Sequence, residues 1–264
     1  MKVGLSTWSL LHSDVYSAVR TIGDAGLDYI ELWGEVPHAY HGWVDKRQLK
    51  DVLSNYNFTM TMHAPFTDLN PATPFEPVKG AVTKTLKSFV NFASELGAAR
   101  VTFHPGSVHS GVLVPQSIED VVSLLRQLVR ESSGRLVINI ENQARSHSHY
   151  DFPVGSDAES IVTILANVEG LSYTLDTGHA HANGEEPSRL YERLKDSVTE
   201  VHLSDNDGKS DDHLIPGQGT ANLKGLLDRI GGPDALVCLE LNPHRYTADE
   251  VLKAAGELKL RKLP

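Results

Sequence analysis

Short apolar runs rich in β-forming residues alternate with longer helix-like segments along the whole chain, and this alternation restricts its fold more than any other feature. The strand-like runs are Lys2–Leu10, Leu27–Trp33, Phe58–Ala64, Arg100–His104, Leu136–Glu141, Leu171–Asp176, Val198–Leu203 and Ala235–Leu241. Such alternation implies parallel strands joined by crossover helices. Eight units in 264 residues predict an α/β fold, a single closed (β/α)8 barrel domain over residues 1–264.

Helical periodicity fills the intervals between these runs. The expected helices span Asp14–Ala25, Asp45–Ser54, Pro77–Leu96, Pro115–Glu131, Asp157–Asn167, Pro187–Asp196, Leu223–Ile230 and Ala248–Leu260. A doubly wound open sheet is the alternative, but the chain has no GxGxxG after its first strand and no GxxxxGK followed by Ser or Thr. We therefore prefer the barrel, whose active site is expected at the C-terminal ends of the strands.

The charge balance restricts the kinds of partner. With 34 acidic and 24 basic residues the formal net charge is −10, which weakens the case for a protein that coats nucleic acid through bulk electrostatics. No apolar run approaches the roughly 20 residues needed to cross a bilayer, and the first residues lack the pattern of a secretory signal peptide. The single cysteine, Cys238, has no partner for an intrachain disulfide. We therefore expect a cytoplasmic enzyme without a membrane partner.

Histidine and carboxylate residues recur where the expected strands end. Nine of them, from six strands and the loops that follow, converge on one face of a barrel: His63, His104, Glu141, Asp176, His179, His202, Asp211, His213 and Glu240. A lone histidine such as His104 is more often a turn or core residue than a ligand. A carboxylate such as Glu141, at the end of a buried apolar strand, needs a cation or several donors.

The chemistry of this set indicates a metal site. Imidazole and carboxylate ligands without thiolates suit a divalent ion such as Zn²⁺, Mn²⁺, Mg²⁺, Fe²⁺ or Co²⁺. The absence of cysteine ligands argues against a closed structural zinc site. An open catalytic site, in which water or substrate completes the coordination, is therefore expected.

Three stretches of the chain carry a resemblance to a known family: residues 201–219, with Asp211-Asp212-His213 and Pro216-Gly217-Gln218-Gly219; residues 63–66; and residues 175–180. With them the chain resembles the xylose isomerase-like TIM-barrel superfamily, which contains sugar-phosphate isomerases and epimerases and also endonuclease IV. The resemblance covers all eight expected strands and implies a TIM barrel.

The isomerase and epimerase branch of this family implies a single divalent ion. Its ligands map to Glu141, Asp176, His202 and Glu240. Glu141 and Glu240 would also be the catalytic acid/base pair, which moves a proton α to the carbonyl of a small sugar or sugar phosphate.

The endonuclease IV branch implies up to three zinc ions and phosphodiester cleavage. The three ligand groups would be His63, His104 and Glu141; Glu141, Asp176, His202 and Glu240; and His179, Asp211 and His213. Nucleic acid is a partner only in this alternative. The DNA-binding residues of that branch have no counterparts in this chain. Phe66 stands where that branch has a tyrosine wedge, and residues 33–41 lack the arginine that penetrates the duplex. We therefore place the isomerase or epimerase first.

Four further residues are candidates for substrate binding. Trp8 and Trp33 lie at the ends of the first two strands and would form an apolar wall for a sugar ring, with packing at the barrel mouth as the alternative. Lys209 and Arg145, on loops, would grip a phosphate or carboxylate group, with solvated loop charge as the alternative. A barrel that binds a metal and a partner protein without catalysis is disfavoured by the size of the ligand set. The sequence leaves open the substrate, the native metal and whether the chain forms a homo-oligomer.

Overall fold

Eight parallel strands close into a barrel in the computed structural model, which describes residues 1–145, 151–232 and 235–261. The strands are β1 (Lys2–Ser6), β2 (Tyr29–Trp33), β3 (Thr59–His63), β4 (Arg100–Phe103), β6 (Val137–Glu141), β8 (Leu171–Asp176), β9 (Val198–Leu203) and β10 (Leu236–Leu239). They follow one another around the barrel in chain order, and β10 pairs with β1 to close it. The predicted (β/α)8 barrel is therefore confirmed.

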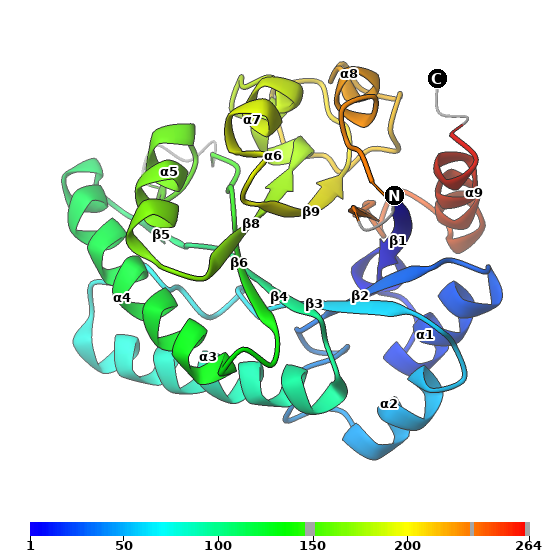
Figure 1. Ribbon diagram of the computed structural model, residues 1–264, viewed down its shortest axis with the longest axis horizontal. Helices are drawn as coiled ribbons and strands as arrows, with labels where there is room; N and C mark the ends of the chain where they lie inside the picture. Colours follow the sequence, from blue (N-terminus) through cyan, green and yellow to red (C-terminus); the bar gives the residue numbers. More distant parts are fainter. Residues whose placement is uncertain (146–150, 233–234, 262–264) are drawn as a thin grey trace.

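Helices surround the strands on the outside (Figure 1). They are α1 (Val15–Asp24), α2 (Lys46–Leu53), α3 (Glu76–Leu96), α4 (Val114–Ser132), α5 (Ala158–Asn167), α6 (Thr177–Ala182), α7 (Pro187–Leu194), α8 (Leu223–Leu227) and α9 (Ala248–Lys259). Four shorter elements add to them: the 3-10 turns η1 (Thr7–Leu10) and η2 (Gly111–Leu113), and the antiparallel pair β5 (Ser107–Val108) and β7 (Phe152–Pro153). Within the described ranges, no helix is both long and apolar enough to span a membrane.

Two local expectations are wrong, and capping side chains explain both. The first strand ends at Ser6 rather than Leu10, because the Ser6 side chain accepts the N–H of Trp8 and begins η1. Thr7 then accepts the N–H of Trp33 at 2.9 Å, which ties η1 to the end of β2. Helix α6 was not expected, but the Asp176 side chain caps it as β8 ends. Both caps lie at the C-terminal ends of strands, beside the expected site.

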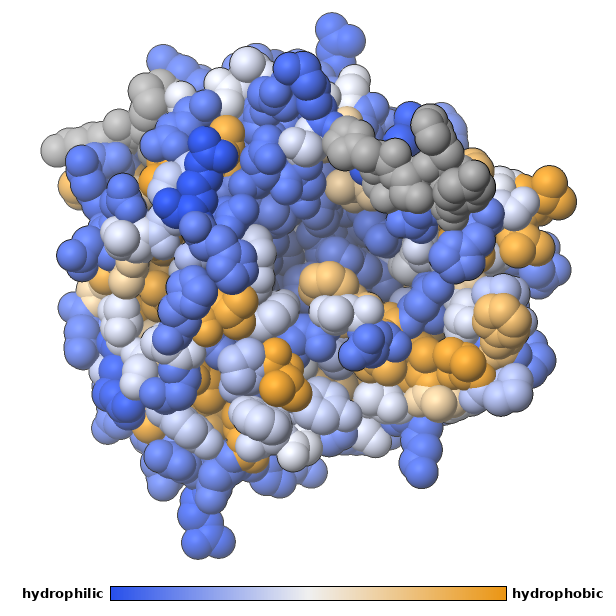
Figure 2. Space-filling view, turned by 180° about the vertical axis from the view of Figure 1, so that it is seen from behind, coloured by the Kyte–Doolittle hydropathy of each residue, from blue (hydrophilic) through white to orange (hydrophobic). Residues whose placement is uncertain are grey.

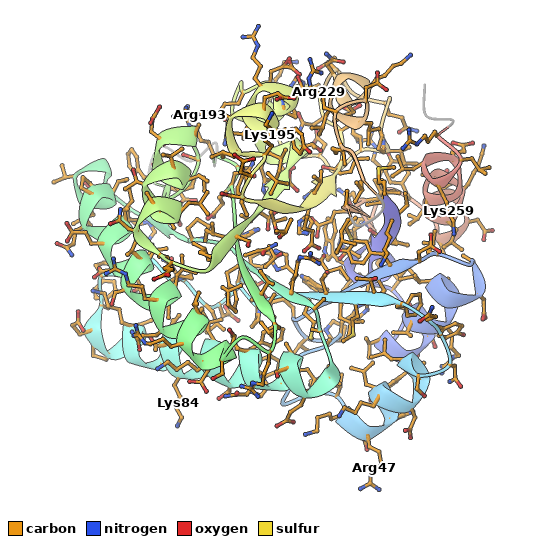
Figure 3. All side chains as sticks on the ribbon, viewed as in Figure 1. Arg47, Lys84, Arg193, Lys195, Arg229 and Lys259 are labelled. Carbon is orange, nitrogen blue, oxygen red and sulfur yellow. The ribbon has the colours of Figure 1, made fainter. Side chains whose placement is uncertain are left out.

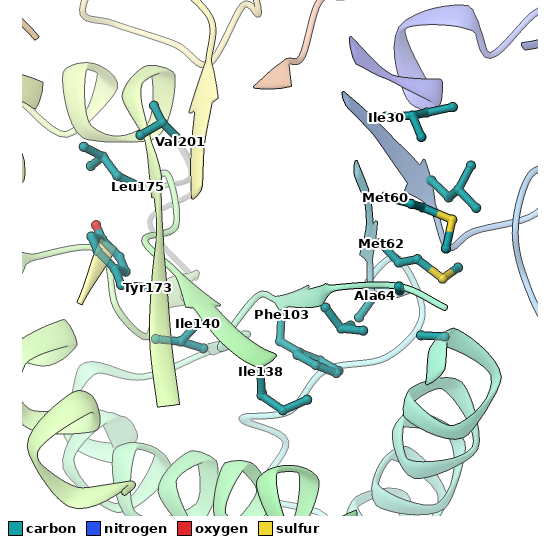
Figure 4. Close-up of a cluster of buried hydrophobic side chains, with 14 of the residues drawn as sticks. Ile30, Met60, Met62, Ala64, Phe103, Ile138, Ile140, Tyr173, Leu175 and Val201 are labelled. Carbon is teal, nitrogen blue, oxygen red and sulfur yellow. The ribbon is translucent and has the colours of Figure 1, made fainter. Parts of the chain in front are cut away.

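Side chains along most of the barrel strands alternate between an apolar outward set and a polar inward set, while Tyr29, Leu236 and Cys238 form a small apolar cluster of their own. In β6, Ile138 and Ile140 belong to the hydrophobic core, whereas Asn139 and Glu141 are buried and polar. Because successive side chains of a strand point to opposite faces, the apolar set packs toward the helices (Figure 4) and the polar set faces the interior. Parallel strands buried on both faces are usually apolar throughout, so this polar interior is a departure that needs a functional explanation.

The outer surfaces of the helices are charged. Side chains such as Arg47, Lys84 and Arg229 point away from the barrel (Figure 3). Lys84 on α3 is exposed, and Arg229 lies 3.6 Å from Glu192 in an exposed ion pair. Such surface charges contribute little to stability, so the apolar layer between strands and helices is the main stabilising layer.

The junction of β2 and β3 depends on a residue without a side chain. The N–H of Gly34 donates to the carbonyl of His63 at 2.9 Å, and a Cβ at Gly34 would overlap both that oxygen and the ring of Phe89. We expect Gly34→Ala to lower the free energy of unfolding by about 2–3 kcal/mol, because the strand ends must separate. Chemical denaturation measures the change.

Gly80 provides the matched control, since it is exposed within α3 and a Cβ there meets nothing within 4 Å. Gly80→Ala is expected to raise stability by up to about 1 kcal/mol, because alanine favours the helix. Equal effects of the two substitutions would contradict this account of the junction.

Candidate metal centre

Glu141 lies at the centre of the site, at the end of β6, and its side chain has no exposure to solvent. Its Oε2 lies 3.1 Å from Nε2 of His104 and 3.2 Å from Nε2 of His63. Its Oε1 lies 3.1 Å from Nδ1 of His202 and 3.6 Å from Nδ1 of His179. Imidazoles from β3, β9, α6 and the loop after β4 therefore surround a single carboxylate.

The structure brings together all nine residues that the sequence singles out as metal ligands. They form three groups, in each of which one ligand atom per residue lies within 4.8 Å of the others. The groups are His63, His104 and Glu141; Glu141, Asp176, His202 and Glu240; and His179, Asp211 and His213. Glu141 belongs to the first two groups. Metal binding by these residues itself stays a prediction.

Two buried carboxylate oxygens without hydrogen-bond partners indicate that the residues suit a cation. Oδ2 of Asp176 and Oδ1 of Asp211 are buried, and neither has a hydrogen-bond partner among the described residues. An oxygen in this state costs free energy unless a donor or a cation compensates it. The nitrogen and oxygen donor set suits zinc, manganese, magnesium or cobalt alike. The residues therefore fit a divalent cation site.

Backbone carbonyl groups orient most of the imidazoles. His179 contacts the carbonyl of Asn142 through Nδ1 at 2.7 Å, and His213 contacts that of Glu240 through Nδ1 at 3.0 Å. A carbonyl accepts only, so Nδ1 carries the proton and Nε2 is left as a ligand atom. The two Nε2 atoms lie 3.1 Å and 2.9 Å from the carboxylate of Asp211.

Neighbouring carboxylates compete with burial for control of the imidazole charges. Burial opposes protonation of His63, but its hydrogen bond to Glu141 and the surrounding carboxylates raise its pKa to about 9. Asp211 likewise overcomes burial and raises the pKa of His213 to about 9. Burial prevails at His104, whose pKa falls to about 4 despite Glu141. The metal-free site therefore holds protons on some imidazoles and excludes them from others.

The pKa values of the two glutamates in the four-residue group, Glu141 and Glu240, are also shifted in opposite directions. Burial raises the pKa of Glu240 to about 8, although His202 opposes the shift. For Glu141 burial acts in the same direction, but His202 and His104 outweigh it and hold its pKa well below the usual range. In the metal-free pair, burial therefore favours the protonated form of Glu240, whereas the neighbouring imidazoles favour the anionic form of Glu141.

A pocket of about 220 Å³ opens above the ligand groups. Its lining residues are Trp8, Trp33, His63, Phe66, His104, His179, Asp211, His213 and Glu240. Figure 2 shows a hollow in the middle of one face of the molecule, with hydrophilic residues around it. Two of the four candidate substrate residues, Trp8 and Trp33, thus border the pocket, and their role in binding stays a prediction.

Lys209 and Arg145 are not among the lining residues. The side chain of Lys209 is exposed and lies 3.0 Å from the carboxylate of Asp207. Arg145 is exposed, and its backbone N–H donates to the side chain of Asn183 at 2.7 Å. The structure therefore does not bring these two cations to the pocket.

Two buried carboxylates of the site are not among the residues that the sequence singles out. Glu31 on β2 and Glu200 on β9 face the barrel interior and form a fourth group with His202. The available signal was the one that identified Glu141, a carboxylate inside an apolar run, here Tyr-Ile-Glu-Leu-Trp.

Known proteins share this architecture. The sequence profile of the xylose isomerase-like TIM barrel family matches residues 19–260. An uncharacterised protein of Methanocaldococcus jannaschii is 28% identical, over 98% of this chain and 90% of that protein. Fructoselysine 3-epimerase of Shigella flexneri is 24% identical, over 87% of this chain and 85% of that protein. The crystal structure of a D-tagatose 3-epimerase-like protein, 25% identical, superposes with a TM-score of 0.83 over 99% of both chains.

Proton competition makes cation binding depend on pH. The pKa of Glu240 is about 8, and those of His63 and His213 are about 9. Because ligands bind a cation in their deprotonated form, protons compete below these values. We expect the dissociation constant for Mn²⁺ to fall about tenfold or more per pH unit between pH 6 and pH 8. Isothermal titration calorimetry measures it, and an affinity independent of pH would contradict the assigned ligands.

Proposed function

We propose that this chain, which belongs to the xylose isomerase-like TIM-barrel family, is a divalent-metal-dependent sugar epimerase or isomerase. One observation carries the proposal: Glu141, Asp176, His202 and Glu240, from or next to the ends of four consecutive barrel strands, meet beneath a pocket. The similar proteins named as fructoselysine 3-epimerase and D-tagatose 3-epimerase-like support a ketose as substrate.

The reaction moves a proton at the carbon next to a carbonyl group, and two carboxylates suit it. Glu141 and Glu240 belong to the same four-residue group, and Glu240 also lines the pocket. One of these carboxylates would accept the proton, and the other would return a proton to the opposite face of the same carbon. A divalent cation, when bound, supplies the Lewis acidity that makes this carbon acidic. After one turnover the pair has exchanged its proton, and proton exchange with solvent restores the starting state.

The pocket walls favour an uncharged sugar. Trp8, Trp33 and Phe66 offer aromatic surface to the apolar face of a sugar ring. Among the described residues that line the pocket there is no lysine or arginine to bind a phosphate group. We therefore propose an unphosphorylated ketose rather than a sugar phosphate.

A second candidate is a three-ion phosphodiesterase. The observation that favours it is the division of nine residues into three groups, each of a size to hold one ion. A phosphodiester strand also needs cationic contacts along its backbone, and Lys209 and Arg145 lie away from the pocket. The phosphodiesterase is therefore placed second.

Solvent exchange tests the first candidate. Incubation of the Mn²⁺-loaded protein with unphosphorylated ketoses in D₂O is expected to introduce deuterium next to the carbonyl and to produce the epimer or isomer, both visible by NMR. Glu240→Gln and Glu141→Gln are each expected to lower kcat by about 10²–10⁴-fold, because the amide cannot accept or carry the proton. Lys84→Ala, at an exposed position on α3, serves as the control and should keep full activity.

Metal content separates the two candidates. One ion per chain, measured by elemental mass spectrometry together with ketose exchange, is the expected result. Three ions per chain, no exchange with any ketose and cleavage of a phosphodiester such as bis(p-nitrophenyl) phosphate would contradict the epimerase and support the second candidate.

A further inference from the structure

His202 is held differently from three other imidazoles of the site. Three imidazoles place Nδ1 on a backbone carbonyl and turn Nε2 toward the ligand groups: His63, His179 and His213. His202 has the opposite orientation. Its Nδ1 lies 3.1 Å from Glu141 and 3.5 Å from Glu240, and its Nε2 points into the barrel. The atom that orients His202 must therefore come from the barrel interior rather than from a backbone carbonyl.

The carboxylate of Glu31 occupies that place. Its Oε2 lies 3.0 Å from Nε2 of His202, across the interior from β9. Glu31 is fully buried, and neither its two oxygens nor Nε2 of His202 has a hydrogen-bond partner among the described residues, so the 3.0 Å approach between them is an ion-pair contact. A buried carboxylate without donors destabilises a fold. Its contact with His202 is therefore the interaction that accounts for it.

Glu200 is the other acidic neighbour of the same nitrogen, but it is engaged elsewhere. Its Oε1 accepts hydrogen bonds from the hydroxyl groups of Thr61, at 2.9 Å, and Tyr29. The distance from this oxygen to Nε2 of His202 is 3.6 Å. Glu31 is thus the nearer acceptor for the imidazole, and both of its oxygens lack a hydrogen-bond partner among the described residues, whereas in Glu200 only Oε2 does.

We propose that Glu31 is a positioning residue for the metal ligand His202. It accepts the Nε2 proton, which leaves Nδ1 bare toward Glu141 and Glu240, and its negative charge strengthens the imidazole as a ligand. The inference rests on the proposed function in one respect, since both require a cation in the four-residue group. It concerns cation binding and holds for any substrate.

Cation affinity tests this role directly. Glu31→Gln keeps the size of the side chain and removes its charge, so the dissociation constant for Mn²⁺ is expected to rise about 10- to 100-fold with an unchanged number of ions per chain. Isothermal titration calorimetry measures both quantities. Glu200→Gln is the matched control, a buried carboxylate of the same group, and a change of less than about threefold is expected there.

The tautomer of His202 gives a second readout that a merely structural role would not move. Long-range ¹H–¹⁵N spectra of the metal-free protein at high pH should show His202 with its proton on Nε2, and Glu31→Gln should shift it toward the Nδ1–H form. Should Glu31→Gln fail to fold, Glu31→Asp withdraws the carboxylate by one methylene group while keeping its charge, and the same weakening of affinity is expected.

Two results would overturn the proposal. The first is unchanged Mn²⁺ affinity together with an unchanged tautomer in the variant. The second is the loss of one whole ion per chain while the remaining ions bind as in the wild type, which would make Glu31 a ligand of a separate interior cation. Absence of epimerase activity in the wild-type protein would refute the proposed function and leave this inference standing.

Discussion

A carboxylate with no access to solvent, contacted by four imidazoles, is the arrangement on which the site depends. Removing the Glu141 charge from water costs several kcal/mol, and only close charged or donor groups compensate that cost. The compensating imidazoles come from β3, β9, α6 and the loop after β4. Strands distant in sequence must therefore end at the same level, which a closed parallel barrel provides.

Because side chains along a strand alternate between two faces, the outward residues of the barrel stabilise the fold and the inward residues form the site. Outward residues such as Ile138 and Ile140 pack toward the helices, and inward residues one position along carry polar groups. The barrel interior can therefore hold buried charges that would destabilise an apolar core. Both oxygens of Glu31 and one oxygen of Asp176 are buried without hydrogen-bond partners among the described residues, and each of these oxygens costs stability at the site.

The sequence predicted the barrel and the set of histidine and carboxylate residues that meet at its strand ends, because both signals are local. Strand and helix periods are read from short windows, and a carboxylate such as Glu141 in an apolar run is visible without a structure. Asp176 shows the limit, because one carboxylate both caps α6 and joins the ligand group. Glu31 also lies in an apolar run, as Glu141 does, but it is two residues before the end of β2, whereas Glu141 is the last residue of β6. Lys209 shows that a loop charge does not reveal where its side chain points, since Asp207, two residues away, pairs with it.

The most direct test of the account is an anomalous difference map, collected at the absorption edge of Mn²⁺ or Zn²⁺ from crystals of the metal-loaded protein. The account predicts a peak about 2.0–2.2 Å from a carboxylate oxygen of Glu141, with Nδ1 of His202 as a second ligand. A peak elsewhere, or none with Glu141 still held only by the imidazoles, would contradict it.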